Sequence, residues 1–182
     1  MKKLVVLFAA LCLIAGCASA AYKRSLKDLP DNNFSVEIPA GWYKPQYEKR
    51  YLITKAEKAT QLYVFIQQRP LDRSFKNTQK KLRPRMLPLE SAGLIIDELS
   101  SDRRIMNFQV LENTPAIIDG HAGFKILFTH QTKNGFKYKT VYYGFINGSS
   151  FYNIRYSAGR PDYYETGIAD FNRIFGSFKL KK

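Results

Sequence analysis

Two Asn-Gly pairs, Asn134-Gly135 and Asn147-Gly148, lie between three stretches rich in β-branched and aromatic residues. Asn-Gly between two such stretches is the strongest short-range signal for a β-hairpin. The two pairs therefore predict three consecutive antiparallel strands, at residues 121–132, 136–146 and 150–158. The fold of this chain is therefore expected to include an antiparallel sheet that contains these three strands.

Further strands are expected before the meander. Phe34, Val36 and Ile38 alternate with polar residues up to a turn at Pro39-Ala40-Gly41, which predicts a short strand. The stretches 51–54 and 61–70 are typical of the next two strands. Residues 108–120 are expected to lead into the meander as another strand.

Two long segments have helical periodicity. Pro88 lies at a helix-start position, and the segment 88–102 places one set of residues on a single face: Leu89, Ala92, Gly93, Ile96 and Leu99. Pro161 begins the second helix, which Gly176 ends. Its packing face is expected to consist of Tyr164, Ile168, Phe171 and Phe175.

The N-terminus has the layout of a secretory signal, with Lys2 and Lys3 before an apolar run from Leu4 to Ile14. That run is shorter than the roughly 20 residues that a membrane-spanning helix needs. Small residues follow the run, so the segment is expected to direct export.

The sequence Ile14-Ala15-Gly16-Cys17 resembles the box that ends bacterial lipoprotein signals, and Cys17 is the expected site of lipid attachment. Cleavage before Cys17 would also remove Cys12 and leave no pair of cysteines for an intramolecular disulfide. Two alternatives stay open: an ordinary signal peptide cleaved within residues 18–21, and an uncleaved anchor.

The lipoprotein interpretation divides the chain into three parts. Residues 1–16 form the signal peptide, and residues 17–33 form a tether, since they are small, polar and charged without apolar periodicity. Residues 34–182 remain, which is the size of one domain with its own core.

The order of these elements resembles the PsbP-like family. The resemblance rests on the opening strand FSVEIPAGW, a central helix, the strand GFKILF with its hairpins, and a final helix followed by FGSFK. It implies an α+β fold, an α/β/α sandwich in which helices cover both faces of an antiparallel β-sheet. Members of the family include an extrinsic photosystem II subunit, a eukaryotic Ran-binding import factor and bacterial lipoproteins. These share binding to other macromolecules more than catalysis, and fold alone does not carry function.

A catalytic or metal site is not expected. His121 and His130 lie an odd number of residues apart in one predicted strand, so they point to opposite faces and cannot share a metal. Glu90 and Asp97 share the outer face of a predicted helix, which is typical of a solvated surface. No motif for a cofactor or a nucleophilic serine is present, so no cofactor is expected.

One basic segment, residues 69–85, stands out against the rest of the chain, with Asp72 as its single acidic residue. Ser74 suits the N-cap of a short helix over 74–82, limited by Pro84. The proposed contact residues in this segment are Arg69, Lys76, Lys80, Lys81, Arg83 and Arg85. A charge run is more commonly a solvated face, and this alternative stays open.

The formal net charge of +14 favours anionic partners. For a protein tethered to a membrane through Cys17, the expected partner is an acidic protein or an anionic lipid surface, and export disfavours nucleic acid. The expected location is the bacterial cell envelope, facing the periplasm. Ala18 is no acidic retention signal, which favours the outer membrane over the inner one.

The sequence therefore predicts a lipid-anchored envelope protein that acts as a non-catalytic binding or accessory module. A first alternative is a carrier that holds a small amphipathic ligand in an aromatic cleft between sheet and helix. Its lining would come from tyrosines of the meander: Tyr138, Tyr142, Tyr143, Tyr152 and Tyr156. A second alternative is an envelope hydrolase.

Overall fold

The computed structural model describes residues 24–25, 33–44, 51–55 and 61–181. The expected signal peptide, Cys17 and most of the expected tether lie outside the described residues.

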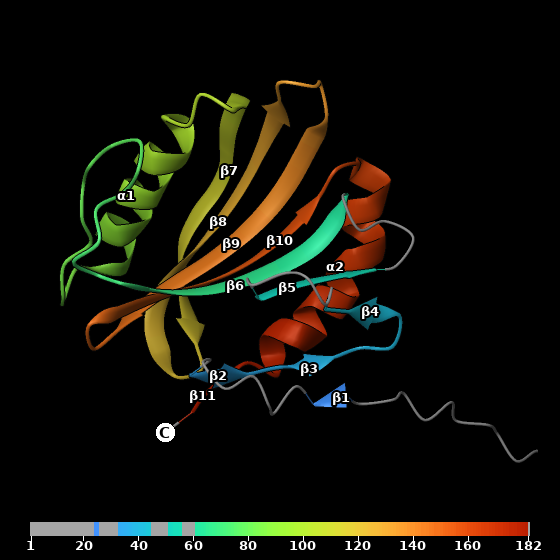
Figure 1. Cartoon of the computed structure of the whole chain (residues 1–182), viewed down its shortest axis with the longest axis horizontal. Coiled ribbons are helices and arrows are strands. Elements are labelled where there is room, and N and C mark those ends of the chain that lie inside the picture. Colours follow the sequence, from blue (N-terminus) through green and yellow to red (C-terminus); the bar gives the residue numbers. More distant parts are fainter. Residues whose placement is uncertain (1–23, 26–32, 45–50, 56–60, 182) are drawn as a thin grey trace, which may run out of the picture.

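A seven-stranded antiparallel sheet forms the centre of the molecule, with the strand order β4-β5-β6-β10-β9-β8-β7 (Figure 1). The strands are β4 (Trp42–Tyr43), β5 (Tyr51–Lys55), β6 (Leu62–Pro70), β7 (Ile105–Ile118), β8 (His121–Thr132), β9 (Lys137–Asn147) and β10 (Ser150–Ala158). The meander predicted from the two Asn-Gly pairs is confirmed, with β9 displaced by one residue. Gly135 and Gly148 adopt φ angles of 83° and 57°, which a residue without a Cβ accepts at least cost.

The stretch around Phe34 differs from its prediction. It forms two short strands, β2 (Phe34–Ser35) and β3 (Glu37–Ile38), neither of which joins the main sheet. β2 pairs with β11 (Lys179–Leu180), and β3 pairs with β1 (Arg24–Ser25). The start of the domain is thus joined to its end by backbone hydrogen bonds.

The two helices lie on opposite faces of the sheet, as the sandwich architecture requires (Figure 1). α1 (Pro88–Ser100) buries Ala92 and Ile95 against one face. α2 (Pro161–Gly176) buries Phe171 and Ile174 against the other. Because successive residues of a strand point to opposite faces, each central strand contributes to both cores. No helix within the described ranges is long and apolar enough to cross a membrane.

The predicted face of α1 is only partly correct. Ala92 is buried and Ile96 and Leu99 are partly buried, but Leu89 in the first turn is 46% exposed. Ile95 fills the core position instead, because it faces the sheet from the middle of the helix.

The helix predicted at residues 74–82 is wrong, since this part of the chain forms turns. Phe75 and Leu82 are buried under α1, which fixes the segment at two points. Between them Gln79 takes a φ angle of 58°, incompatible with a continuous helix. The amide groups of Asn77 and Thr78 donate to the carboxylate of Glu98 on α1. A side chain from a distant helix therefore replaces the hydrogen bonds that a local helix would have supplied.

Candidate functional site

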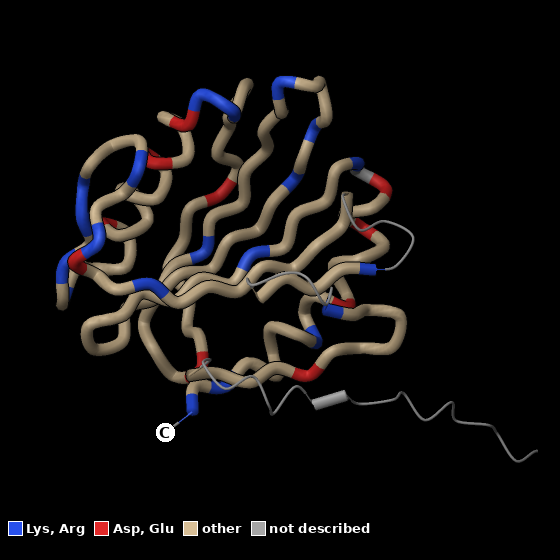
Figure 2. Tube along the Cα trace, in the orientation of Figure 1, with Lys and Arg blue, Asp and Glu red and all other residues tan. Residues whose placement is uncertain are grey.

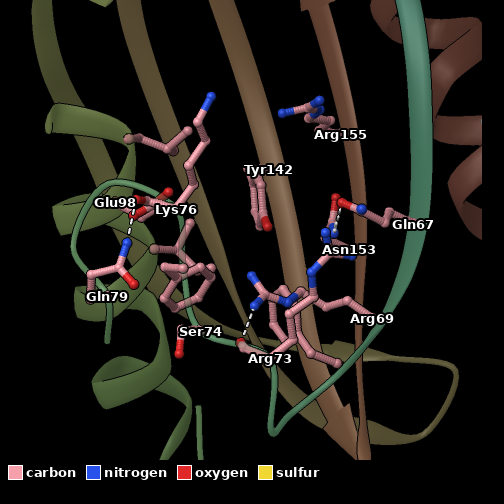
Figure 3. A pocket seen from close by; sticks show the side chains of 14 residues that line it. Gln67, Arg69, Arg73, Ser74, Lys76, Gln79, Glu98, Tyr142, Asn153 and Arg155 are labelled. Carbon is pink, nitrogen blue, oxygen red and sulfur yellow. Dashed lines mark hydrogen bonds between the residues drawn. The ribbon is translucent and has the colours of Figure 1, made fainter. Parts of the chain in front are cut away.

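A cavity of about 490 Å³ lies between α1, the basic segment and strands β6, β9 and β10 (Figure 3). We call it the basic pocket, because four cationic side chains line it: Arg69, Arg73, Lys76 and Arg155. Arg69 comes from the end of β6, and Arg73 and Lys76 come from the turns that follow it. Arg155 comes from the middle of β10, far away in the sequence.

The register of the sheet places Arg155 in the pocket. Its two neighbours across the sheet are Phe65 on β6 and Tyr142 on β9. The guanidinium lies over the Phe65 ring, with Cζ 4.4 Å from the ring centroid. This stacking covers one face of the guanidinium. The N–H groups at its edge can still donate hydrogen bonds to a ligand.

Arg69 is held in a similar way. Its Cζ lies 4.2 Å from the centroid of the Phe75 ring, and Nη2 donates a hydrogen bond to the carbonyl oxygen of Arg73. Burial lowers the pKa of Arg69; the nearby Arg73 lowers it further, whereas Tyr142 and Glu98 raise it. Neither Arg69 nor Arg155 forms an ion pair with another residue that the structure describes.

Glu98 is the one carboxylate among the residues that line the basic pocket, and its oxygens are already engaged. Oε1 accepts from the backbone and side-chain amides of Asn77 at 3.0 and 2.9 Å. Oε2 accepts from the backbone N–H and the hydroxyl of Thr78 at 2.9 and 3.1 Å. Glu98 therefore fixes the turns of the basic segment and forms no ion pair within 4 Å with any of the four cations.

Neutral polar groups complete the pocket. Tyr142 is buried, which raises the pKa of its hydroxyl despite the nearby Arg155 and Arg69, so the hydroxyl stays protonated at neutral pH. Asn153 is 3% exposed, and its Nδ2 lies 3.5 Å from Oε1 of Gln67. Cationic and amide donors thus face one cavity, and this arrangement is suited to binding an anion.

The structure divides the residues proposed from the basic segment into three groups. Arg69 and Lys76 line the basic pocket. Lys80 forms an exposed ion pair with Asp97 at 2.7 Å. The remaining three are exposed and form no side-chain hydrogen bond or ion pair with the residues that the structure describes: Lys81, Arg83 and Arg85.

Sequence reasoning missed Arg155 as a site residue and placed Tyr142 only in a hypothetical aromatic cleft. No local signal marks Arg155, because it joins the basic segment only through the pairing of β6 with β10. The tyrosines of the meander do not gather in one cleft. Tyr142 lines the basic pocket, whereas Tyr143 stacks on Phe175 and Tyr156 on Phe171 on the α2 side.

The two histidines lie on opposite faces of the sheet, as predicted. The His121 ring lies 5.1 Å from that of Phe145, and the His130 ring stacks on Tyr138 at 5.2 Å. Burial lowers the pKa of His130, and the nearby Arg155 lowers it further. Within the described ranges, no three His, Cys, Asp or Glu side chains are grouped to hold a metal ion.

Glu90 and Asp97 do not form a pair. The carboxylate of Glu90 accepts a hydrogen bond from the backbone N–H of Leu87, which caps α1, while Asp97 contacts Lys80. Ser150 accepts a hydrogen bond from Gln68. Each of these side chains therefore has a structural contact.

No protein-family profile matches the chain. No curated protein matches it either. Solved structures do resemble it. Cyanobacterial PsbP (CyanoP) from Synechocystis superposes with a TM-score of 0.60 at 11% identity, covering 91% of this chain and 96% of that one. LpqN of Mycobacterium tuberculosis, involved in cell envelope biogenesis, gives 0.60 at 14% identity over 82% and 83%.

The Ran-binding protein Mog1p of Saccharomyces cerevisiae gives a TM-score of 0.55 at 8% identity over 88% of this chain and 96% of that one. At sequence identities this low, the structural similarity shows a shared fold and does not show a shared function. The chain therefore has the PsbP-like fold, an antiparallel sheet between two helices.

Proposed function

We propose that this chain is a lipid-anchored, non-catalytic accessory protein of the bacterial cell envelope. Its basic segment docks on the anionic headgroups of the membrane to which Cys17 tethers it. The observation that carries the proposal is a group of cations in the turns beside α1 that have no ion-pair partner among the described residues. The exposed Lys81, Arg83 and Arg85 follow the pocket residues Arg73 and Lys76 along the same turns, and Figure 2 shows basic charge along the turns beside α1.

Two further points support the proposal. A single acyl chain gives only marginal membrane binding, and each cation close to an anionic membrane surface adds about 1 kcal/mol. LpqN, which has the same fold, is involved in cell envelope biogenesis. An accessory role in the envelope agrees with both.

The test replaces Lys81, Arg83 and Arg85 together by Glu in the full chain and measures binding to phosphatidylglycerol vesicles. A matched variant replaces Lys133, Lys137 and Lys181 by Glu; these three lysines are also exposed and lie outside the basic segment. We expect the first variant to bind at least about tenfold more weakly than the second, given the contribution of each charge. The difference should shrink in salt, once the Debye length falls below about 8 Å.

The two variants change the net charge equally, so their comparison separates a localised surface from a diffuse positive field. Equal losses in both variants would contradict docking through the basic segment. Unchanged vesicle binding in both would contradict membrane docking altogether and leave an acidic protein as the partner to seek.

A carrier function is the second candidate, because a cavity of about 490 Å³ does lie between a helix and the sheet. The expected cleft was aromatic and suited to an amphipathic ligand. The cavity found has cations and amides among its lining residues, so a carried ligand would have to be anionic.

A further inference from the structure

We infer that the basic pocket binds a phosphorylated sugar, that is, a ring with several hydroxyl groups and at least one phosphate. The inference rests on the proposed function, in which this side of the molecule binds an anionic envelope component, and it adds the chemistry of the ligand. It is carried by the charge, the neutral polar groups and the size of the pocket.

The positive charge of the pocket favours a ligand with two negative charges. Arg69 and Arg155 are half-buried, and neither has a carboxylate partner among the described residues. Burying a charge is costly unless it is paired. Arg73 and Lys76 add two exposed cations, while the hydrogen bonds from Asn77 and Thr78 occupy Glu98. A phosphate monoester carries about −1.5 to −2 charges at neutral pH and offers three acceptor oxygens, so it compensates more of this charge than a carboxylate can.

The neutral groups in the pocket suit hydroxyls. Asn153 and Gln67 each present both a donor and an acceptor, and the protonated hydroxyl of Tyr142 can do the same. Figure 3 shows these three side chains along the sheet side of the pocket, between Arg155 and Arg69. Sugar hydroxyls also donate and accept, and a ring with several hydroxyls can reach the three side chains at once, which a single small anion cannot.

The size of the pocket separates a sugar phosphate from phosphate alone. A cavity of about 490 Å³ falls in the range of small-molecule sites and is much larger than one phosphate needs. Its walls also include the rings of Phe75 and Phe151 and the side chain of Leu99. Phe151 is fully buried and the guanidinium of Arg69 covers the Phe75 ring, so a sugar ring can pack its C–H face on Leu99, which is only partly buried, while its hydroxyls face the amides.

The first experiment measures, by isothermal titration calorimetry, the binding of four probes to the full-length chain in detergent. The probes are glucose 6-phosphate, inorganic phosphate, glucose and glucuronate. We expect glucose 6-phosphate to bind at least about tenfold more tightly than each of the other three, because it alone has both a dianion and a ring. Glucose 6-phosphate binding no tighter than inorganic phosphate, or glucuronate binding more tightly, would overturn the inference.

Variants then locate the binding site. Arg155→Met keeps an unbranched stem over Phe65 but removes the guanidinium, and Tyr142→Phe keeps the ring but removes the hydroxyl. Lys133→Met is the control, since it makes the same change of charge on an exposed turn outside the pocket. We expect Arg155→Met to weaken glucose 6-phosphate binding about tenfold or more and Tyr142→Phe by a few-fold, with Lys133→Met unchanged.

Thermal unfolding shows whether each variant keeps its fold. If the Arg155→Met protein does not fold, Tyr142→Phe provides the second test of the site. Equal affinities of the Arg155→Met and Lys133→Met proteins would overturn the inference, as would an unchanged affinity in a folded Tyr142→Phe protein.

The ligand could be free or the headgroup of a glycolipid, and vesicles distinguish these sources. If vesicles containing lipid A, a phosphorylated and acylated glucosamine disaccharide, are bound more tightly than phosphatidylglycerol vesicles and Arg155→Met abolishes that preference, the ligand is a headgroup. Binding of soluble glucose 6-phosphate without that preference supports a free sugar phosphate.

The docking proposal can be contradicted without affecting the proposed ligand of the pocket. The triple Lys81, Arg83, Arg85 variant alters no residue that lines the pocket. It can leave phosphatidylglycerol binding unchanged, and so contradict docking, while glucose 6-phosphate binding remains intact.

Discussion

At the scale of single residues, Asp170 connects three elements. Its Oδ2 accepts a hydrogen bond from Nε1 of Trp42 on β4 at 2.9 Å and lies 2.8 Å from Nζ of Lys55 on β5. Burial on its own would raise the pKa of Asp170, but the hydrogen bonds from Lys55 and Trp42 outweigh it and hold the pKa below its usual range. The carboxylate of α2 thus fixes the edge of the sheet.

We expect Asp170→Asn to lower the free energy of unfolding by about 1 kcal/mol at pH 7, because the amide cannot form the ion pair with Lys55. Since the pKa in the folded protein is lower than in the unfolded chain, this contribution is complete above the unfolded value of about 4. It is lost as the pH falls through the folded pKa. Urea unfolding at pH 7 and pH 3 should therefore give a difference between the two proteins that shrinks in acid. A difference independent of pH would contradict this role.

At the scale of elements, the shape of the basic segment depends on α1. Glu98 accepts from Asn77 and Thr78, which pins the turns that carry Arg73 and Lys76 to the helix. The ion pair between Lys80 and Asp97 is a second link between the segment and α1, but both side chains are about half exposed, so it adds little. Glu98 therefore helps to position Arg73 and Lys76, whereas strand pairing positions Arg155.

We expect Glu98→Gln to loosen this segment without unfolding α1. A glutamine side chain offers one acceptor oxygen in place of two, so some of the amide hydrogen bonds are lost. Hydrogen exchange at the backbone amides of Asn77 and Thr78 should quicken by about tenfold or more, given the strength of hydrogen bonds to charged groups. Glu165→Gln, which removes the same charge from α2, should leave these amides unchanged. Equal exchange in both variants would contradict the anchoring role.

At the scale of the whole molecule, the two faces of the sheet differ in how they are filled. On the α2 side, rings pack on one another, with Phe171 5.3 Å from Tyr156 and Phe178 6.0 Å from Phe145. The α1 side has a compact core as well, but it leaves the basic pocket between the helix, the turns and the sheet. The pocket proposed to bind a ligand therefore belongs to the α1 face of the sheet.

The proposed anchor concerns the whole molecule too. We expect Cys17→Ala to block signal processing and to move the protein from the membrane fraction to a larger precursor without a lipid. Cell fractionation and labelling with a radioactive fatty acid measure both effects. Cys12→Ala, in the same segment, should change neither, since the expected cleavage removes that residue. Fatty-acid label that persists in the Cys17→Ala protein would contradict lipid attachment at this residue.

The sequence by itself predicted the strands of the meander, the two strands at residues 51–54 and 61–70 and the two long helices, while their arrangement as a sandwich was implied by the resemblance to the PsbP-like family. Alternation along a strand, Asn-Gly at a turn and apolar spacing on a helix are local patterns, and the physical preference behind each acts within a few residues. The prediction from the sequence was wrong at residues 74–82, where the local pattern favoured a helix. There the carboxylate of Glu98 supplied hydrogen bonds from outside the segment.

Only the tertiary structure decided where the binding groups meet. The sequence pointed to Arg69 and Lys76 as part of a basic segment, but their partners in the pocket come from β9 and β10. Arg155 reaches Phe65 and Tyr142 through the register of three strands. Such a register results from the packing of the entire sheet and not from any short stretch, which is why charge could be predicted from the sequence and the pocket could not.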